Sequence, residues 1–195
     1  MDLTLILGPM KSGKSLELIE YFFNIQKKNI PFKLYQPLKN VRDKHINSRA
    51  GLFIKAEKIK DLFEIKEGNA KIIGIDEIHM FKKEEVKAIE RLLEKRIKVI
   101  AAGLDRDYKG EIFSIIKQLL KLNPDKVEFK KSICEICGKS EAVYTQIYKD
   151  NKPILDGLPP CVPDDGTYQY KPVCANCFQR KYDLRYRQVI KINTK

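Results

Sequence analysis

The strongest chemical signal in the chain is a short glycine-rich segment near its start. Residues 8–15 read Gly-Pro-Met-Lys-Ser-Gly-Lys-Ser and fit the pattern G-x-x-x-x-G-K-[ST]. In such a loop the glycines permit a tight turn whose backbone N–H groups surround phosphate oxygens. The lysine, here Lys14, reaches the β- and γ-phosphates, and the hydroxyl of Ser15 ligates Mg²⁺. An incidental glycine turn is the alternative, but this segment follows an apolar strand and opens a helix, as phosphate binding requires.

A second candidate site lies where an apolar run ends in two carboxylates. Residues 72–77 read Ile-Ile-Gly-Ile-Asp-Glu. In phosphate-loop proteins an acidic residue at a strand end holds Mg²⁺ or its water, which suits Asp76. Glu77 is then free to act as a base on a hydroxyl or water, because adjacent residues of a strand point to opposite faces. Alternatively, both are acids that stabilise a helix N-terminus. We interpret His79 as structural rather than as a metal ligand.

Four of the five cysteines form two Cys-x-x-Cys pairs, at Cys134 and Cys137 and at Cys174 and Cys177. Two such pairs complete a tetrahedral Zn²⁺ site, and four cysteine ligands make that site closed and structural. The connection between the pairs is longer than the usual ~15–20 residues, which implies a long loop. Two redox-active pairs are the alternative. We interpret Cys161 as a free thiol in that loop.

The connection between the cysteine pairs has a composition of its own. Residues 151–172, which we call the lasso loop, are rich in proline and carry Tyr168 and Tyr170. Proline and glycine punctuate any linker, so chance composition is one interpretation. The other is that aromatic side chains, tethered by a metal beside a nucleotide site, fold over a base and stack on it.

Hydrophobic periodicity predicts the elements that position these sites. The predicted strands are residues 3–7, 32–35, 71–75, 99–102 and 127–129, and the predicted helices begin at 15 or span 84–95 and 112–122. This alternation predicts an α/β fold: a P-loop, three-layer, parallel-sheet domain over residues 1–131. Residues 39–51 lack a clear period and are predicted to be a loop. After Ser132 the composition changes, which predicts a small zinc-ribbon-like domain with the lasso loop over residues 132–195.

The bulk composition sets outer limits on the function. The chain has 195 residues, 43% of them hydrophobic, and a formal net charge of +12. Such a charge attracts polyanions, whether nucleic acid, nucleotide phosphates or acidic membrane, although a solvated lysine-rich surface is the more common explanation. The start lacks the features of a signal peptide, and no apolar run approaches the ~18 residues that span a bilayer. We therefore expect a soluble, cytoplasmic protein without membrane contact.

Taken in order, these features resemble the type II thymidine kinases, the zinc-containing, tetrameric kind, over nearly the whole chain. The resemblance is carried by the Gly-Pro-Met-x-Ser-Gly-Lys-Ser loop, the Ile-Asp-Glu strand end, both cysteine pairs, Ala-Gly-Leu-Asp at 102–105, Tyr-Lys-Gly at 108–110, Phe113 and Tyr-Lys-Pro at 170–172. It implies a homotetramer, ATP and a nucleoside as substrates, Mg²⁺ and structural Zn²⁺ as cofactors, and a lasso loop over the base.

The resemblance also implies how individual residues are used. Glu77 would be the general base that takes the proton from the nucleoside 5′-hydroxyl. ATP and Mg²⁺ would be held by Gly8, Pro9, Met10, Lys11, Ser12, Gly13, Lys14, Ser15, Arg42, Asp76, Glu77, Ile78 and His79. The nucleoside pocket would be formed by Met10, Leu104, Tyr108, Phe113, Thr145, Val162, Asp164 and Tyr170. Backbone at residues 161–165 would bond the edge of the base.

The chain departs from the family pattern at three places. Lys11 stands where the family usually has an aromatic residue, and Asn40 stands where it usually has Asp near an arginine. A neutral amide at position 40 weakens any metal or water role there, whereas Arg42 remains to steady phosphate charge. The lasso loop also lacks the Gly-Gly or Gly-Ala segment that is usual in the family.

The combined prediction is transfer of the ATP γ-phosphoryl group to the 5′-hydroxyl of thymidine, giving dTMP and ADP in nucleotide salvage, and also to the 5′-hydroxyl of deoxyuridine. A P-loop kinase for another deoxynucleoside is one alternative. An ATP-dependent, nucleic-acid-binding zinc protein is a second, which the charge of +12 permits. Against it, the chain shows no basic helix interleaved with aromatics and no recognisable nucleic-acid module.

Overall fold

The computed structural model describes residues 2–40 and 44–180, and a six-stranded parallel sheet forms its centre. The strand order is β5-β2-β6-β7-β1-β8, and every pairing is parallel. The strands are β1 (Leu3–Leu7), β2 (Phe32–Pro37), β5 (Glu57–Ile59), β6 (Ile72–Ile75), β7 (Lys98–Gly103) and β8 (Lys126–Phe129). The central strands are almost continuously apolar and buried, as expected for a parallel sheet that is covered on both faces.

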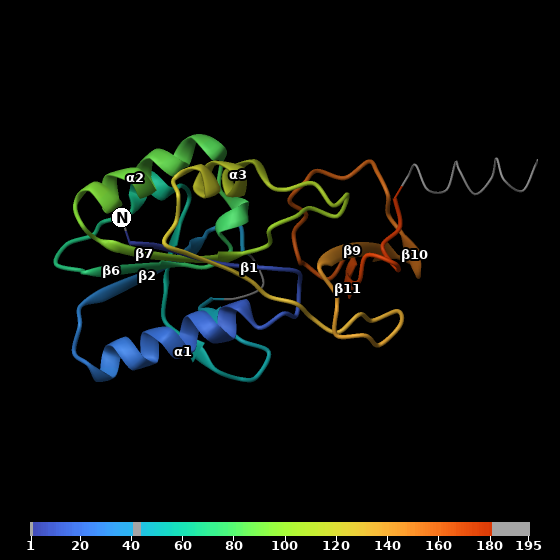
Figure 1. The fold of residues 1–195 in the computed structure, drawn as a ribbon, viewed down its shortest axis with the longest axis horizontal. Helices are drawn as coiled ribbons and strands as arrows, with labels where there is room; N and C mark the ends of the chain where they lie inside the picture. The colour runs from blue at the N-terminus through green and yellow to red at the C-terminus, as the bar shows by residue number, and fades with distance from the viewer. Residues whose placement is uncertain (1, 41–43, 181–195) are drawn as a thin grey trace, which may run out of the picture.

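Helices cover both faces of this sheet and so make three layers (Figure 1). Helix α1 (Lys14–Lys27) lies on one face, and α2 (Val86–Glu94) and α3 (Ser114–Lys121) lie on the other. Short 3₁₀ helices occupy Leu62–Glu64, Ile78–Met80 and Lys83–Glu85. Each face has its own apolar core, and the α1 side is so tight that a Cβ at Gly74 would lie 2.4 Å from Phe22 and Leu34. The predicted three-layer α/β architecture is confirmed.

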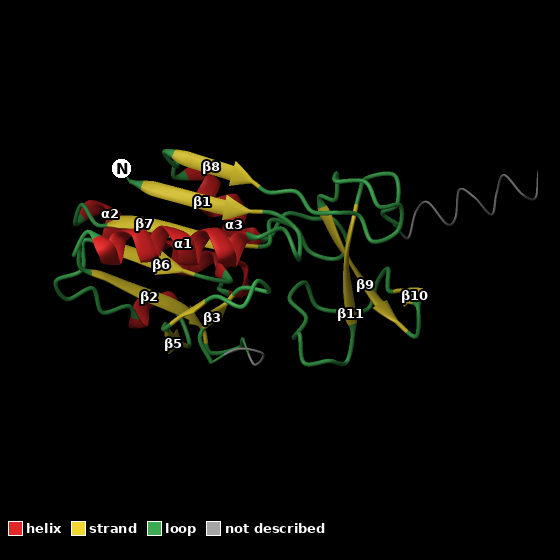
Figure 2. Ribbon diagram, turned by 90° about the horizontal axis from the view of Figure 1, so that it is seen from below, coloured by secondary structure: helices red, strands yellow, loops and turns green. Residues whose placement is uncertain are grey.

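A second, smaller unit follows the sheet. It contains an antiparallel sheet of β9 (Tyr144–Lys149), β10 (Lys152–Pro153) and β11 (Gln169–Val173), in the order β10-β9-β11. A separate apolar cluster gathers around its cysteines. Figure 2 shows this unit on the side to which the arrows of β1 and β8 point, so it faces the carboxyl ends of the parallel strands. The phosphate loop, which follows β1, and the two carboxylates, which follow β6, both lie at that edge of the sheet.

The element boundaries differ from the sequence predictions in informative places. The five predicted strands are present, α1 begins one residue before its predicted start, and α2 and α3 are shorter than predicted. Residues 39–51 are not wholly a loop, because β3 (Ile46–Asn47) pairs with β4 (Phe53–Ile54) in a small hairpin. Helix α3 begins two residues after Ile112, because that residue pairs with Arg106 in an isolated bridge. None of the described helices is long and apolar enough to cross a membrane.

Candidate functional site

The phosphate loop joins β1 to α1 and depends on unusual backbone angles. Gly8 has φ 146°, and a Cβ there would lie 2.6 Å from the Lys130 carbonyl oxygen. Lys11 has φ 61° and Gly13 φ 82°, which turns the chain back into the first turn of α1. The buried Lys14 ammonium donates to the Pro9 carbonyl at 2.6 Å and so lies inside the loop. This arrangement presents backbone amides and one ammonium at a helix N-terminus, which suits polyphosphate.

Strand β6 delivers an acidic group to this loop. The hydroxyl of Ser15 donates to Asp76 Oδ2 at 3.1 Å. Burial, reinforced by the neighbouring charge of Glu77, raises the pKa of Asp76 to about 7. A carboxylate and a hydroxyl side by side are the hard oxygen donors that Mg²⁺ prefers, so the residues present fit this ion.

Glu77 turns away from Asp76 because its backbone is left-handed. Its φ and ψ are 51° and 40°, which is uncommon for a residue with a side chain. Backbone strain of this kind concentrates at functional sites. The two neighbouring carboxylates therefore point in different directions. Asp76 contacts Ser15, whereas Glu77 lines the cavities described next.

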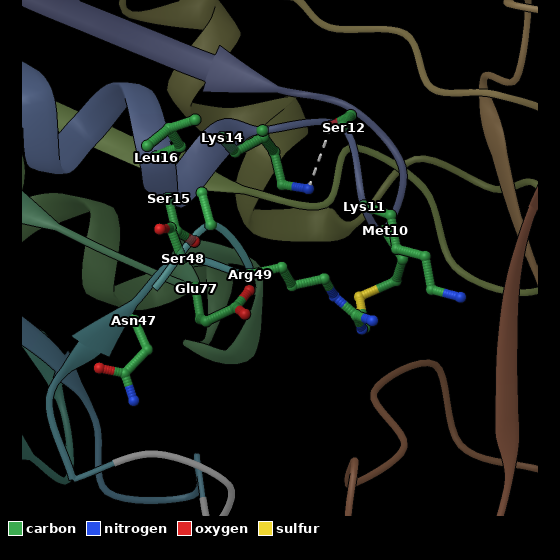
Figure 3. A pocket seen from close by; sticks show the side chains of 12 residues that line it. Met10, Lys11, Ser12, Lys14, Ser15, Leu16, Asn47, Ser48, Arg49 and Glu77 are labelled. Carbon is green, nitrogen blue, oxygen red and sulfur yellow. Dashed lines mark hydrogen bonds between the residues drawn. The ribbon is translucent and has the colours of Figure 1, made fainter. Parts of the chain in front are cut away.

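Three adjoining cavities lie along this edge of the sheet. The phosphate cavity (Figure 3) is lined by residues 10–16 of the loop, by 47–50 and by Glu77. The middle cavity is lined by Met10, Lys39, Asn40, Glu77, His79, Met80, Leu104, Val162, Asp164 and Tyr170. The inner cavity is lined by His79, Leu104, Arg106, Asp107, Tyr108, Phe113, Thr145, Ile147, Pro160, Cys161, Val162 and Tyr170. Met10 and Glu77 belong to both the first and the second, so they stand where these cavities meet.

The structure brings together most of the residues that the sequence singled out. Every residue proposed for the nucleoside lines the middle or the inner cavity, namely Met10, Leu104, Tyr108, Phe113, Thr145, Val162, Asp164 and Tyr170. Of the residues proposed for ATP, Ile78 is instead fully buried in the core and His79 lines the middle and inner cavities. Arg42 lies outside the described residues.

The imidazole of His79 is buried beside the middle and inner cavities. Its ring is buried against Phe113, with 4.9 Å between ring centroids, and burial lowers its pKa to about 4. Its Nδ1 accepts a hydrogen bond from the Leu104 amide at 3.2 Å and lies 3.5 Å from Glu77 Oε2. The imidazole therefore links the 3₁₀ turn after β6 to the segment after β7.

The lasso loop is held over the inner cavity by tyrosine hydroxyls. Tyr108 donates to the Leu158 carbonyl at 2.8 Å and accepts from the Leu158 amide at 3.0 Å. Tyr170 donates to the Pro163 carbonyl at 2.8 Å. Cys161 packs against the main core and lines the inner cavity, where burial raises the pKa of its thiol. A free thiol in the loop was expected, and Cys161 is free.

Removing the Tyr108 hydroxyl should loosen the lasso loop without touching the phosphate loop. In Tyr108→Phe both hydrogen bonds to Leu158 are lost, at a cost of about 1–2 kcal/mol, so we expect the nucleoside KM to rise roughly 5–30-fold with little change in kcat. Steady-state kinetics measure both. Tyr168→Phe serves as the control in the same loop, because the Tyr168 hydroxyl makes no hydrogen bond within the described residues. An unchanged KM in Tyr108→Phe would contradict the prediction.

The phosphate loop also docks onto the cysteine unit, a contact that sequence reasoning missed. The amide of Met10 donates to Thr145 Oγ1 at 2.9 Å, and Ser132 Oγ donates to the Lys11 carbonyl at 3.0 Å. The Lys11 ammonium pairs with Glu135, which lies between two cysteines of the cluster. Lys11, which stands where the family usually has an aromatic residue, therefore has a partner of opposite charge.

The second departure, Asn40, belongs to a buried polar network. Its Nδ2 donates to Gln36 Oε1 at 3.2 Å, and Lys58 donates to its carbonyl at 2.6 Å. Gln36 is fully buried at the end of β2 and donates in turn to the Lys44 carbonyl at 3.0 Å. The side-chain amide of Asn40 thus helps to hold the segment at residues 39–40, which lines the middle cavity.

The two cysteine pairs meet as predicted. The sulfurs of Cys134, Cys137, Cys174 and Cys177 all lie within 4.8 Å of one another, and the Sγ atoms of Cys137 and Cys174 are 3.7 Å apart. A tetrahedron with metal–sulfur bonds of ~2.3 Å has edges of about 3.8 Å. The cluster could therefore hold a metal ion, and its four thiols fit a closed tetrahedral site.

The hairpin residues at the phosphate cavity were also missed by sequence reasoning. Asn47, Ser48 and Arg49 line this cavity, and they fall in residues 39–51, where the sequence predicts a loop of a length that is often functional but assigns a role to none of these three. A short Ser-Arg-Ala-Gly turn at 48–51 was the available signal.

The parallel sheet carries a phosphate loop, a carboxylate at the end of a strand and adjoining cavities lined by Glu77. This combination defines a phosphate-loop nucleotide-binding protein. The family model described as thymidine kinase matches residues 1–178, and the chain belongs to this family. A thymidine kinase of Mycoplasmoides gallisepticum is 34% identical over 177 residues, covering 88% of this chain and 78% of that protein. One from Pseudothermotoga lettingae is 31% identical over 185 residues, covering 91% and 95%. One from Amsacta moorei entomopoxvirus is 30% identical over 194 residues, covering 93% and 100%.

Proposed function

We propose that the protein transfers the γ-phosphoryl group of ATP to the 5′-hydroxyl of thymidine, giving dTMP and ADP, and also to that of deoxyuridine, giving dUMP and ADP. The observation that carries this proposal is the position of Glu77, which lines both the phosphate cavity and the middle cavity. A base between the two cavities can reach a hydroxyl that approaches the terminal phosphate. Membership of the thymidine kinase family supports the same reaction.

The phosphate end of the site would bind and orient ATP. The loop amides and Lys14 would hold the β- and γ-phosphates, and Ser15 with Asp76 would hold Mg²⁺. When bound, this ion neutralises phosphate charge. Glu77 would accept the 5′-hydroxyl proton as the oxygen–phosphorus bond forms, and ADP would leave in line.

The nucleoside end would enclose the base. Phe113, Tyr108 and Leu104 supply an apolar wall to the inner cavity, and Thr145 supplies a polar group. Backbone of the lasso loop at 161–165 would bond the base edge. A structural Zn²⁺ on the four cysteines would fix the return of this loop through β11, which ends directly before Cys174, as its fit to the thiol cluster supports.

A panel of nucleosides incubated with labelled ATP tests the proposal. We expect thymidine and deoxyuridine to be phosphorylated and the purine deoxynucleosides to remain unchanged, because the proposed acceptors are pyrimidine deoxynucleosides and the chain belongs to the thymidine kinase family. Phosphorylation of a different nucleoside alone would keep the kinase class and overturn the acceptor. No phosphorylation, together with DNA or RNA binding that weakens steeply with salt, would instead favour a nucleic-acid-binding protein.

We further propose that the protein assembles as a homotetramer. We also propose that each chain consists of two domains with a boundary near residue 131, and that the protein works in the cytoplasm. The resemblance to the type II enzymes supports the assembly. Apolar side chains that are exposed in the isolated chain, Phe129, Ile133 and Ile136, lie on and just after the edge strand β8 and would be covered in an oligomer. Light scattering in solution measures the assembled mass.

A further inference from the structure

The β3–β4 hairpin is rooted in the core beneath helix α1. Ile46 and Ile54 face each other across the hairpin and are both buried. They pack in one apolar cluster with Leu18, Ile19 and Phe22 of α1. Because α1 begins at Lys14 of the phosphate loop, the base of the hairpin and the loop share one rigid support.

The tip of the hairpin has a defined turn. The Ser48 amide donates to the Leu52 carbonyl at 2.8 Å, and the Gly51 amide donates to the Ser48 carbonyl at 3.1 Å. The Ser48 hydroxyl also accepts from the Leu52 amide at 3.2 Å, and Gly51 has φ 85°. A three-residue loop that ends in a left-handed glycine is a common hairpin geometry. Arg49 is therefore carried at a fixed place in the turn.

Arg49 reaches from this turn into the phosphate cavity. It lines that cavity together with Lys14, Ser15 and Glu77 (Figure 3), and so enters from a different element than the phosphate loop does. Within residues 2–40 and 44–180 no ion pair engages its guanidinium. Lys11, the neighbouring cation of the cavity, is by contrast paired with Glu135.

We propose that Arg49 contacts the γ-phosphoryl group and neutralises the charge that develops on it during transfer, an inference that rests on the proposed kinase function. Guanidinium stays charged at any working pH, and its planar donors match phosphate oxygens in pairs. In the reaction the bond from the 5′-oxygen to phosphorus forms, the bond from phosphorus to the ADP oxygen breaks, and the hydroxyl proton goes to Glu77. Arg49 keeps its protons throughout and holds the equatorial oxygens, as arginines brought to phosphate loops from other elements do.

The contact is tested with Arg49→Ala and Arg49→Lys. We expect kcat of Arg49→Ala to fall about 10²–10³-fold, the thymidine KM to change little, and Arg49→Lys to recover part of kcat. Because ADP lacks the γ-phosphate, affinity for a non-hydrolysable ATP analogue should fall about tenfold more than affinity for ADP. Lys55→Ala is the control, since Lys55 is an exposed cation just after β4 and lines none of the three cavities. Its kinetics should stay within about twofold of the wild type, as is usual for exposed positions.

Two results would overturn the inference. One is a kcat for Arg49→Ala within about threefold of the wild type, since charge neutralisation at the reacting group is worth far more. The other is an equal loss of affinity for ADP and for the ATP analogue, which would place Arg49 on another part of the nucleotide. If the wild type itself fails to phosphorylate thymidine, the proposed function fails, whereas the comparison of ADP with the ATP analogue still decides whether Arg49 touches the γ-phosphate.

Discussion

Glu77→Gln should abolish phosphorylation of thymidine while the protein still binds ATP. Glutamine keeps the shape of the side chain but cannot take a proton, so kcat should fall about 10²–10⁴-fold, the range for a lost general base. The contacts to phosphate remain, because Lys14, Ser15 and the loop amides are unchanged. Single-turnover kinetics measure the chemical step, and calorimetric titration with an ATP analogue measures binding.

Glu84→Gln is the matched control for this prediction. Glu84 follows the same strand, is exposed, and pairs only distantly with Lys83, at 3.8 Å. It should retain wild-type kinetics. Undiminished turnover in Glu77→Gln would remove the base from the proposed mechanism, and equal losses in both variants would show a general effect of charge.

The phosphate site could be predicted from sequence because its parts are local. Gly8, Gly13 and Lys14 lie in one short segment, and the positive φ angles of Gly8 and Gly13 follow from residue type. Asp76 was also predictable, since the ends of parallel strands meet at one edge of a sheet. The motifs therefore reveal these residues, although Gly8 lies against Lys130 and Asp76 contacts Ser15, pairs that are far apart in sequence.

Of the elements that were not predicted, the short strands between residues 46 and 59 lack a periodic signal. Strand β5 has one buried residue, Ile59, and each strand of the β3–β4 hairpin has only one, Ile46 or Ile54. Two or three residues cannot establish a period of two, so pairing decides their structure instead. Because Arg49 lies in the turn of this hairpin, its position at the phosphate cavity could not be predicted without the hairpin.

The remaining gaps concern contacts between residues far apart in sequence. Tyr108 bonds Leu158 across 50 residues, and the amide of Met10 bonds Thr145 across 135. Such pairs are set by how the cysteine unit docks on the sheet edge, and neither residue type signals the partner. The resemblance placed Tyr108 and Thr145 in the nucleoside pocket, but it did not show that they also hold the lasso loop and the phosphate loop.

Removing one ligand of the cysteine cluster should unfold the second unit and abolish thymidine binding. A structural Zn²⁺ contributes roughly 10–16 kcal/mol in small domains, which matches or exceeds the ~5–15 kcal/mol stability of an ordinary domain. In Cys174→Ser the cluster loses a thiolate directly after β11, the strand that carries Tyr170. The lasso loop would lose its return path over the inner cavity. Isothermal titration with thymidine should therefore detect no binding, and chelation of the wild type should have the same effect.

Metal content and ADP affinity separate this prediction from global unfolding. The parallel sheet keeps its own core, so Cys174→Ser should still bind ADP, weakened only severalfold by loss of the Thr145 contact to Met10. Elemental analysis should find one zinc per chain in the wild type and none in Cys174→Ser. Cys161→Ser should keep its zinc, because Cys161 lies outside the cluster. A Cys174→Ser protein that binds thymidine with wild-type affinity would show that the loop needs no metal, because strand pairing between β9 and β11 would then suffice to hold it.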